Sequence, residues 1–212
     1  MAKTTPQMKF WQGTFGKEYT ERNTYGPEEL DRYYQKTLGI TLTAMNRYLL
    51  KDLRIGSVLE VGCNIGMKLN HLQRMGYENL YGIELQLQAV ERAKQRAKNI
   101  KIVQGSAFDI PFKDKFFDLV FTNGVLIHID PEDLKDAMGE IHRCSKKYIS
   151  GLEYFSEQSE QVPYHEKKNR LWRNNFPALY QQYFPGLKLL RSEKYYYRGS
   201  RTLCDVAFIF QK

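Results

Sequence analysis

The chain has 212 residues, of which 42% are hydrophobic and 26% charged, and its formal net charge is +8. This size suits one globular domain with an extension or insertion, and we find neither a low-complexity tract nor a repeat. No apolar run is long enough to span a membrane, residues 1–6 lack the apolar core of a signal peptide, and three widely spaced cysteines suggest neither a disulfide framework nor a zinc cluster. We therefore expect a cytoplasmic protein without a metal. The positive charge favours an anionic partner, but charge alone is better explained by lysines that keep the surface soluble, because the basic residues are dispersed except in the last quarter of the chain.

Residues 1–53 are predicted to form a helical segment ahead of the main domain. Residues 10–19 are rich in aromatic side chains, and their glycines argue against one long helix. A helix is expected from Pro27, because proline followed by two glutamates is typical of a first turn. A second helix is expected over residues 41–53, with Tyr48 on its apolar face.

From residue 54 onward, apolar strand patterns alternate with helical ones. Strands are predicted at residues 57–61, 79–84, 100–103, 117–122 and 147–152, and helices at residues 67–75, 86–98 and 131–143. Such alternation predicts crossover units and a doubly wound parallel sheet. Residues 187–191 and 202–210 are predicted to be an antiparallel hairpin, which completes a Rossmann-like α/β sheet of seven strands. Residues 153–185 are expected to be an insertion within this domain, 54–212.

The stretch VLEVGCNIG, residues 58–66, predicts a ligand-binding turn after the first strand. Its glycines do not fit the dinucleotide fingerprint G-x-G-x-x-G, because Asn64 replaces the second glycine and Met67 the third. Asparagine tolerates a left-handed backbone, so the turn can still form. The close approach that a pyrophosphate needs is lost, however, and Glu60 would repel phosphate. A nicotinamide dehydrogenase is therefore disfavoured.

Glu84 ends the second predicted strand, 18 residues after Gly66. A carboxylate in this position can accept both hydroxyls of an adenosine ribose. A solubilising charge at a strand end is the alternative, but the second carboxylate at Glu60 favours ligand binding.

These stretches, together with YGIEL and GSAFDIPFKDKFFDLVFTNGVLIHI, resemble the successive motifs of class I S-adenosylmethionine-dependent methyltransferases. The resemblance covers residues 58–129, and the order of predicted elements extends it to the end of the chain. FWQGTFGKEYTERN, the Asn-containing turn, GVLIHI and NRLW further resemble the methylases associated with pseudaminic acid biosynthesis. This narrower resemblance implies a role in carbohydrate biosynthesis.

The resemblance implies a role for each motif residue toward S-adenosylmethionine. Gly62 and Gly66 would line its methionine half, and Glu60 would orient the ammonium. Glu84 would hold the ribose, and Leu85 would pack on the adenine.

The later motifs contribute three more residues. Ser106 and Ala107 stand where many members of the family carry Asp-Ala, so that Ser106 or the backbone would have to bind the adenine amino group. Asn123, after the fourth strand, would pass close to the sulfonium.

Methyl transfer to a hydroxyl needs a base, and His128, just after the fourth strand, is the candidate catalytic residue. The alternative is that His128 caps a short helix or bonds to backbone. An amine acceptor needs no dedicated base, because it need only be neutral when it attacks.

Two aromatic segments are candidates for closing the site. Trp11, Tyr19 and Arg22 would form a lid over the cofactor, or else merely dock the N-terminal segment on the core. The insertion mixes basic and aromatic groups that could bind an anionic acceptor, or form a solvated helix with its tryptophan in the core. These candidate substrate residues are Tyr164, His165, Arg170, Trp172 and Arg173.

We thus expect a methyltransferase acting at nitrogen or oxygen of a small molecule, a sugar or nucleotide-sugar intermediate. An RNA methyltransferase is the alternative that the positive charge favours, although no RNA-binding module and no Asn-Pro-Pro-Tyr-like tetrapeptide follows the fourth strand. The third possible function is a module that binds S-adenosylmethionine without catalysing a reaction. The sequence does not determine the oligomeric state.

Overall fold

The computed structural model describes residues 3–165 and 167–212. Of residues 1–6, which were expected not to form a signal peptide, the first two lie outside the described residues. Its centre is a seven-stranded sheet with the order β3-β2-β1-β4-β5-β9-β8. The strands are β1 (Val58–Val61), β2 (Leu80–Glu84), β3 (Lys101–Gln104), β4 (Phe117–Asn123), β5 (Ser145–Tyr154), β8 (Lys188–Tyr196) and β9 (Cys204–Gln211). Strands β1 to β5 are mutually parallel, and β9 runs antiparallel to both β5 and β8. The predicted fold class is confirmed.

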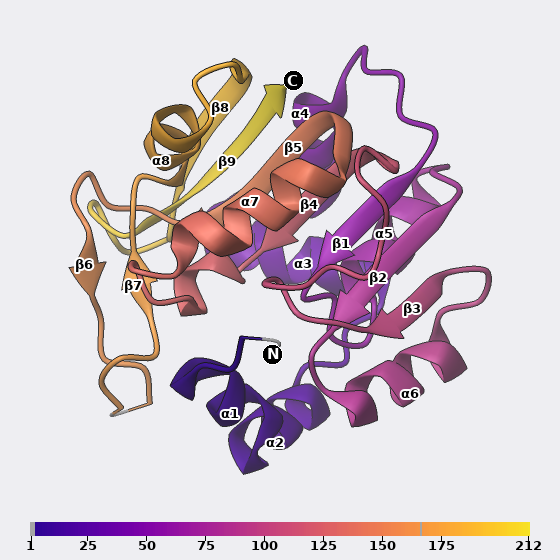
Figure 1. Cartoon of the computed structure of the whole chain (residues 1–212), viewed down its shortest axis with the longest axis horizontal. Coiled ribbons are helices and arrows are strands. Elements are labelled where there is room, and N and C mark those ends of the chain that lie inside the picture. The colour runs from indigo at the N-terminus through magenta and orange to yellow at the C-terminus, as the bar shows by residue number, and fades with distance from the viewer. Residues whose placement is uncertain (1–2, 166) are drawn as a thin grey trace.

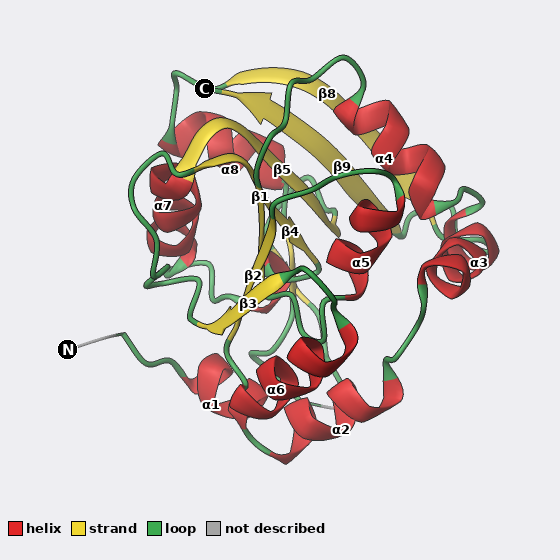
Figure 2. Cartoon of the chain, turned by 90° about the vertical axis from the view of Figure 1, so that its right-hand side faces the viewer, coloured by secondary structure: helices red, strands yellow, loops and turns green. Residues whose placement is uncertain are grey.

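Helices cover both faces of this sheet (Figures 1 and 2). They are α3 (Pro27–Leu38), α4 (Leu42–Leu50), α5 (Met67–Arg74), α6 (Leu87–Arg96), α7 (Leu134–Cys144) and α8 (Phe176–Tyr183). One core contains the buried residues of α3 to α6, and a second core, across the sheet, contains those of α7 and α8. The chain order reverses at β1 and β4, and the carboxyl ends of these strands mark where ligands bind in such sheets.

The N-terminal segment is helical but broken, as its glycines indicate. Helices α1 (Pro6–Gln12) and α2 (Thr14–Arg22) are separated by Gly13. Both lie across the lower end of the sheet in Figure 1, apart from the two main helical layers. This pair of helices is called the lid below.

Two expectations about helices were wrong. The helix expected at residue 131 begins at Leu134, because Pro131 belongs to a turn that precedes it. Tyr48 does not share the buried face of α4, since it is 43% exposed. The helix buries Leu50 together with Leu42, Met45 and Leu49, which turns its apolar stripe away from Tyr48.

The insertion is not one solvated helix. It contains the short antiparallel pair β6 (Glu160–Gln161) and β7 (Trp172–Arg173), followed by α8. No helix within residues 3–165 or 167–212 combines the length and the apolar character that a membrane crossing requires.

Replacement by alanine should have opposite effects on stability at two glycines, because the space around them differs. A Cβ on Gly151, in β5, would lie 2.4 Å from Cζ of the buried Phe208, whereas a Cβ on Gly139, in α7, meets nothing within 4 Å. We expect Gly151→Ala to lower the free energy of unfolding by about 1–3 kcal/mol through overpacking. Gly139→Ala should raise it by roughly 0.5–1 kcal/mol, because alanine favours a helix interior. Urea unfolding monitored by circular dichroism measures both, and equal effects would contradict the packing of β5 against β9.

Candidate functional site

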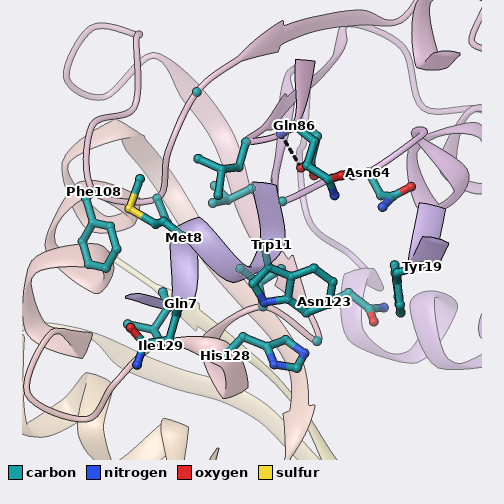
Figure 3. A pocket seen from close by; sticks show the side chains of 18 of the residues that line it. Gln7, Met8, Trp11, Tyr19, Asn64, Gln86, Phe108, Asn123, His128 and Ile129 are labelled. Atoms are coloured by element: carbon teal, nitrogen blue, oxygen red, sulfur yellow. Dashed lines mark hydrogen bonds between the residues drawn. The ribbon is translucent and has the colours of Figure 1, made fainter. Parts of the chain in front are cut away.

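A cavity of about 140 Å³ lies where the carboxyl ends of β1, β2 and β4 meet the lid. Figure 3 shows side chains from the lid and from the loops after these strands turned toward a common space. The lining residues include Thr5, Gln7, Met8, Trp11, Tyr19, Gly62, Asn64, Lys68, Glu84, Leu85, Gln86, Ala107, Phe108, Asn123, His128 and Ile129. Segments far apart in the sequence therefore form one site.

The turn after β1 has the left-handed backbone that the sequence indicated. Gly62, Asn64 and Gly66 have φ angles of 74°, 48° and 75°. A Cβ on Gly62 would lie 2.7 Å from Cγ2 of Val125, so the loop after β4 requires glycine there. Gly66 does not line the cavity, because it faces Ile102 of β3.

Asn64 joins this turn to the lid. Its Oδ1 accepts a hydrogen bond of 2.8 Å from the Ile65 N–H, which stabilises the turn, and its Nδ2 donates at 2.9 Å to Oγ1 of Thr20 in α2. Thr20 is only 2% exposed. The asparagine thus has a second function that a glycine in this position would lack.

Glu84 is held by backbone donors at the cavity wall. Its Oε2 accepts from the Asn64 N–H and its Oε1 from the Gln86 N–H, both at 2.9 Å. Burial raises the pKa of Glu84, and the two N–H donors act in the opposite direction. The two bonds orient both carboxylate oxygens and leave each with a further lone pair for a ligand.

The two carboxylates near the turn differ in their access to the cavity. Glu60 is 1% exposed, lies behind the turn rather than in the cavity wall, and has an Oε2 without a hydrogen-bond partner. Burial raises the pKa of Glu60 to about 8, and nearby Lys68 opposes that shift. Glu60 is therefore not in the position expected for a direct ligand of an ammonium.

Lys68 lines the cavity instead, and the sequence reasoning missed it. Burial acts to lower the pKa of Lys68, but neighbouring Tyr34, Tyr19 and Glu60 outweigh burial and raise that pKa above its ordinary value. Lys68 is therefore a protonated amine at neutral pH. Its place in the first turn of α5 was the available signal, because that turn follows the glycine-rich loop directly.

Asn123, at the end of β4, is fixed by the helix layer. Its amide lies 3.2–3.3 Å from the Tyr34 hydroxyl of α3. Burial raises the pKa of Tyr34 to about 12, so the hydroxyl keeps its proton. The contact holds the Asn123 amide at the cavity wall.

His128 ends a short 3₁₀ helix, η1 (Leu126–His128), and lines the cavity. Its Nδ1 lies 2.7 Å from the carbonyl oxygen of Arg170. A carbonyl can only accept, so Nδ1 carries the hydrogen and Nε2 keeps a free lone pair. Burial lowers the pKa of His128 to about 4. His128 therefore both bonds to backbone and presents a neutral, proton-accepting nitrogen at neutral pH.

The lid packs around this histidine with aromatic rings. The Trp11 ring lies 4.7 Å and the Tyr164 ring 5.0 Å from the His128 ring, measured between centroids. Phe15 contacts Tyr164 and His165 of the insertion in turn. The lid and the insertion thus enclose one side of the site together.

The five candidate substrate residues do not line the cavity. Trp172 is buried in the core with 6% exposure, Arg173 pairs with Glu160, and the Arg170 guanidinium lies over the Phe10 ring. Tyr164 and His165 form the wall behind the lid.

Besides Glu60 and Gly66, two further candidate cofactor residues lie outside the cavity wall. Arg22 pairs with Glu18, and the Ser106 hydroxyl caps the N–H of Phe108. In contrast Trp11, Tyr19, Asn64, Leu85 and Ala107 all line it. Gln7, Met8 and Gln86 line it as well and belong to no motif that the sequence reasoning used. Phe108 and Ile129 also line it; they lie within the stretch of residues 105–129 that carries the resemblance, which assigned them no role.

Comparison with known proteins gives a partial sequence match. Residues 59–148 match the model of a family described as a methyltransferase domain. An uncharacterized methyltransferase of Synechocystis sp. is 33% identical over 89 residues, which cover 42% of this chain and 42% of that protein. One from Alkaliphilus oremlandii is 32% identical over 89 residues, covering 42% and 40%. The chain thus matches about two fifths of the length of these relatives.

Solved structures share the fold over nearly the whole chain. Magnesium protoporphyrin IX methyltransferase from Synechocystis PCC 6803, with bound S-adenosylmethionine, has a TM-score of 0.68, 13% identity, and coverage of 100% of this chain and 99% of its own. 1,6-Didemethyltoxoflavin-N1-methyltransferase from Burkholderia thailandensis has a TM-score of 0.69, 14% identity, and coverage of 100% and 92%. At such identities the likeness concerns the fold, which is the Rossmann-like fold of these methyltransferases.

The bond between Asn64 and Thr20 predicts how firmly the lid is held. Thr20→Val keeps the shape of the side chain but leaves Asn64 Nδ2 without its acceptor, at a cost of about 1 kcal/mol. We expect roughly fivefold faster amide hydrogen exchange in residues 5–22, with the sheet unaffected. Thr14→Val, at the exposed start of α2, is the matched control. Unchanged exchange in the Thr20 variant would show that this bond does not hold the lid.

Proposed function

We propose that the chain is an S-adenosylmethionine-dependent methyltransferase that modifies a small molecule, a sugar or nucleotide-sugar. The observation that carries the proposal is Glu84, fixed by the N–H groups of Asn64 and Gln86 at the wall of the cavity. A carboxylate oriented by two donors suits the two hydroxyls of a ribose. The match of residues 59–148 to a methyltransferase domain supports the same conclusion.

The cavity residues fit the chemistry of this cofactor. Glu84 would accept the ribose hydroxyls, and Leu85, Ala107 and Phe108 offer apolar surface for the adenine. Gly62 leaves room beside the turn for the methionine half. Lys68 would pair with the carboxylate of that half, which is the one anionic group that the cofactor carries.

The residues around His128 can assist transfer. When bound, S-adenosylmethionine supplies an electrophilic methyl group. His128 Nε2 would accept the proton that a hydroxyl or ammonium acceptor loses, while the Arg170 carbonyl holds the opposite ring nitrogen. Trp11 and Tyr19 would exclude water from the reacting groups.

The cover that the lid and the insertion form on one side of the site supports a small acceptor. The lid and the insertion pack on each other over the cavity, so a polymer would have to displace both. Lys167 and Arg170 stack on the lid's Phe10 and place positive charge at this boundary, which suits an anionic acceptor. The resemblance to pseudaminic acid-associated methylases, with NRLW inside the insertion, supports the choice of a sugar.

Cofactor binding provides the first test. Titration calorimetry with S-adenosylhomocysteine should show binding to the wild type and at least about tenfold weaker binding to Glu84→Gln, because one charge-assisted acceptor is lost. Glu91→Gln, on the exposed surface of α6, should leave the affinity unchanged. A wild-type protein without affinity would refute the proposal.

The second test determines which class of molecule accepts the methyl group. Cofactor with a labelled methyl group should transfer label to a member of a nucleotide-sugar panel and not to total RNA. His128→Gln should lower that turnover by roughly 10²–10⁴-fold if the acceptor is a hydroxyl, since general-base catalysis contributes that much. Label found only in RNA would establish the RNA methyltransferase instead, and cofactor binding without any transfer would indicate a binding module.

A further inference from the structure

The N-terminus of η1 has an unusual cap. The residue that precedes it, Val125, offers no side-chain acceptor, and the first N–H groups of any helix lack partners within the helix. Glu153, near the end of the neighbouring strand β5, supplies the acceptors. Its Oε1 accepts from the Val125 N–H at 3.2 Å and its Oε2 from the Ile127 N–H at 3.4 Å.

The burial of Glu153 indicates a specific task. The side chain is 1% exposed, and a carboxylate is costly to bury unless hydrogen bonds compensate. An apolar residue would fit the surrounding core without that cost. It would leave the N–H groups of η1 unpaired, in the segment that ends at His128.

The loop is held at its other positions as well. The Gly124 N–H donates to the Leu152 carbonyl of β5 at 2.9 Å, and the Arg170 carbonyl accepts from the His128 ring. The N–H groups that Glu153 accepts from, at residues 125 and 127, lie between these two contacts along the loop. Three anchors thus determine where His128 lies.

We infer that Glu153 is a positioning residue, which caps η1 and so holds the His128 ring on the Arg170 carbonyl with Nε2 left for the cavity. It acts through the helix and touches no substrate. Its significance for methyl transfer rests on the proposed function, whereas the cap itself is independent of any ligand.

The electrostatic surroundings of Glu153 agree with this role. Burial raises the pKa of Glu153 to about 7, while the N–H groups of η1 act to lower it. The ionisable groups that face it from other elements are Asp205 of β9 and Tyr180 of α8. Protonation of Glu153 below neutral pH would remove charge from the cap and loosen η1.

Histidine NMR tests the inference without an acceptor. In the wild type, long-range ¹⁵N spectra should show His128 as the neutral Nδ1–H form, with protonation near its pKa of about 4. Glu153→Gln keeps only one accepting oxygen, so His128 should leave the carbonyl part of the time and the Nε2–H tautomer should become populated, because the Arg170 carbonyl no longer selects Nδ1–H. The spectrum of His128→Gln assigns the signal.

Two controls separate capping from general damage. Asp205→Asn alters a buried carboxyl of similar pKa, about 7, that bonds to Tyr197 rather than to η1, and should leave His128 unchanged. His71 and His142 report on the rest of the fold and should keep their signals. If Glu153→Gln disturbs them, Glu153→Asp is measured by the same criteria, because it keeps the charge and shortens the reach.

The outcomes are distinct from those of the proposed function. An unchanged His128 signal in a folded Glu153 variant, or an equal shift in Asp205→Asn, would overturn the inference. Absence of S-adenosylhomocysteine binding would sink the proposed function and leave the cap intact. Once an acceptor is turned over, Glu153→Gln should lower kcat about tenfold at unchanged cofactor affinity.

Discussion

The hydrogen bond from the Asn64 N–H to Glu84 is the contact on which the site depends, because it connects the turn after β1 to the end of β2. The left-handed backbone at Asn64 points this N–H toward the carboxylate. The side chain of the same residue then reaches Thr20 of the lid. One asparagine therefore couples the shape of the turn, the orientation of the candidate ribose ligand and the closure of the site.

Burial without a strong ion pair determines the charges around the cavity. Glu60 and Glu153 both have pKa values raised by burial, and His128 has one lowered by it. Desolvation disfavours the charged form in each case. Lys68 is the exception among the groups near the cavity, since its neighbours keep it protonated. The Lys68 ammonium and the Glu84 carboxylate place groups of both signs in the cavity wall, which suits a zwitterionic ligand better than a pyrophosphate.

The sequence predicted the sheet and the motif loops because both follow from local rules. Strand and helix periods alternate plainly, and the turn at Gly62 requires residue types that tolerate a positive φ. The sequence predicted that Trp11 and Tyr19 belong to a lid, but it could not predict where the lid contacts the domain, because no local pattern specifies that position. Arg170 and Trp172 were expected to bind substrate, with Trp172 in the core as the alternative, and no local pattern could decide between the two. Their composition suggested a binding helix, whereas long-range packing places one on the lid and the other in the core.

The most informative residues of the insertion act through backbone rather than side chain. Arg170 was a candidate for its guanidinium, yet its carbonyl oxygen determines which nitrogen of His128 is free. Every residue type carries such a carbonyl, so no sequence pattern could reveal this contact. The role of Glu153 could not be predicted from the sequence either, because a glutamate at the end of a strand is usually interpreted as a solvent-exposed charge. Both act on the same short helix, so the chemistry of His128 is set by a backbone carbonyl and by a side chain to which the sequence reasoning assigned no role.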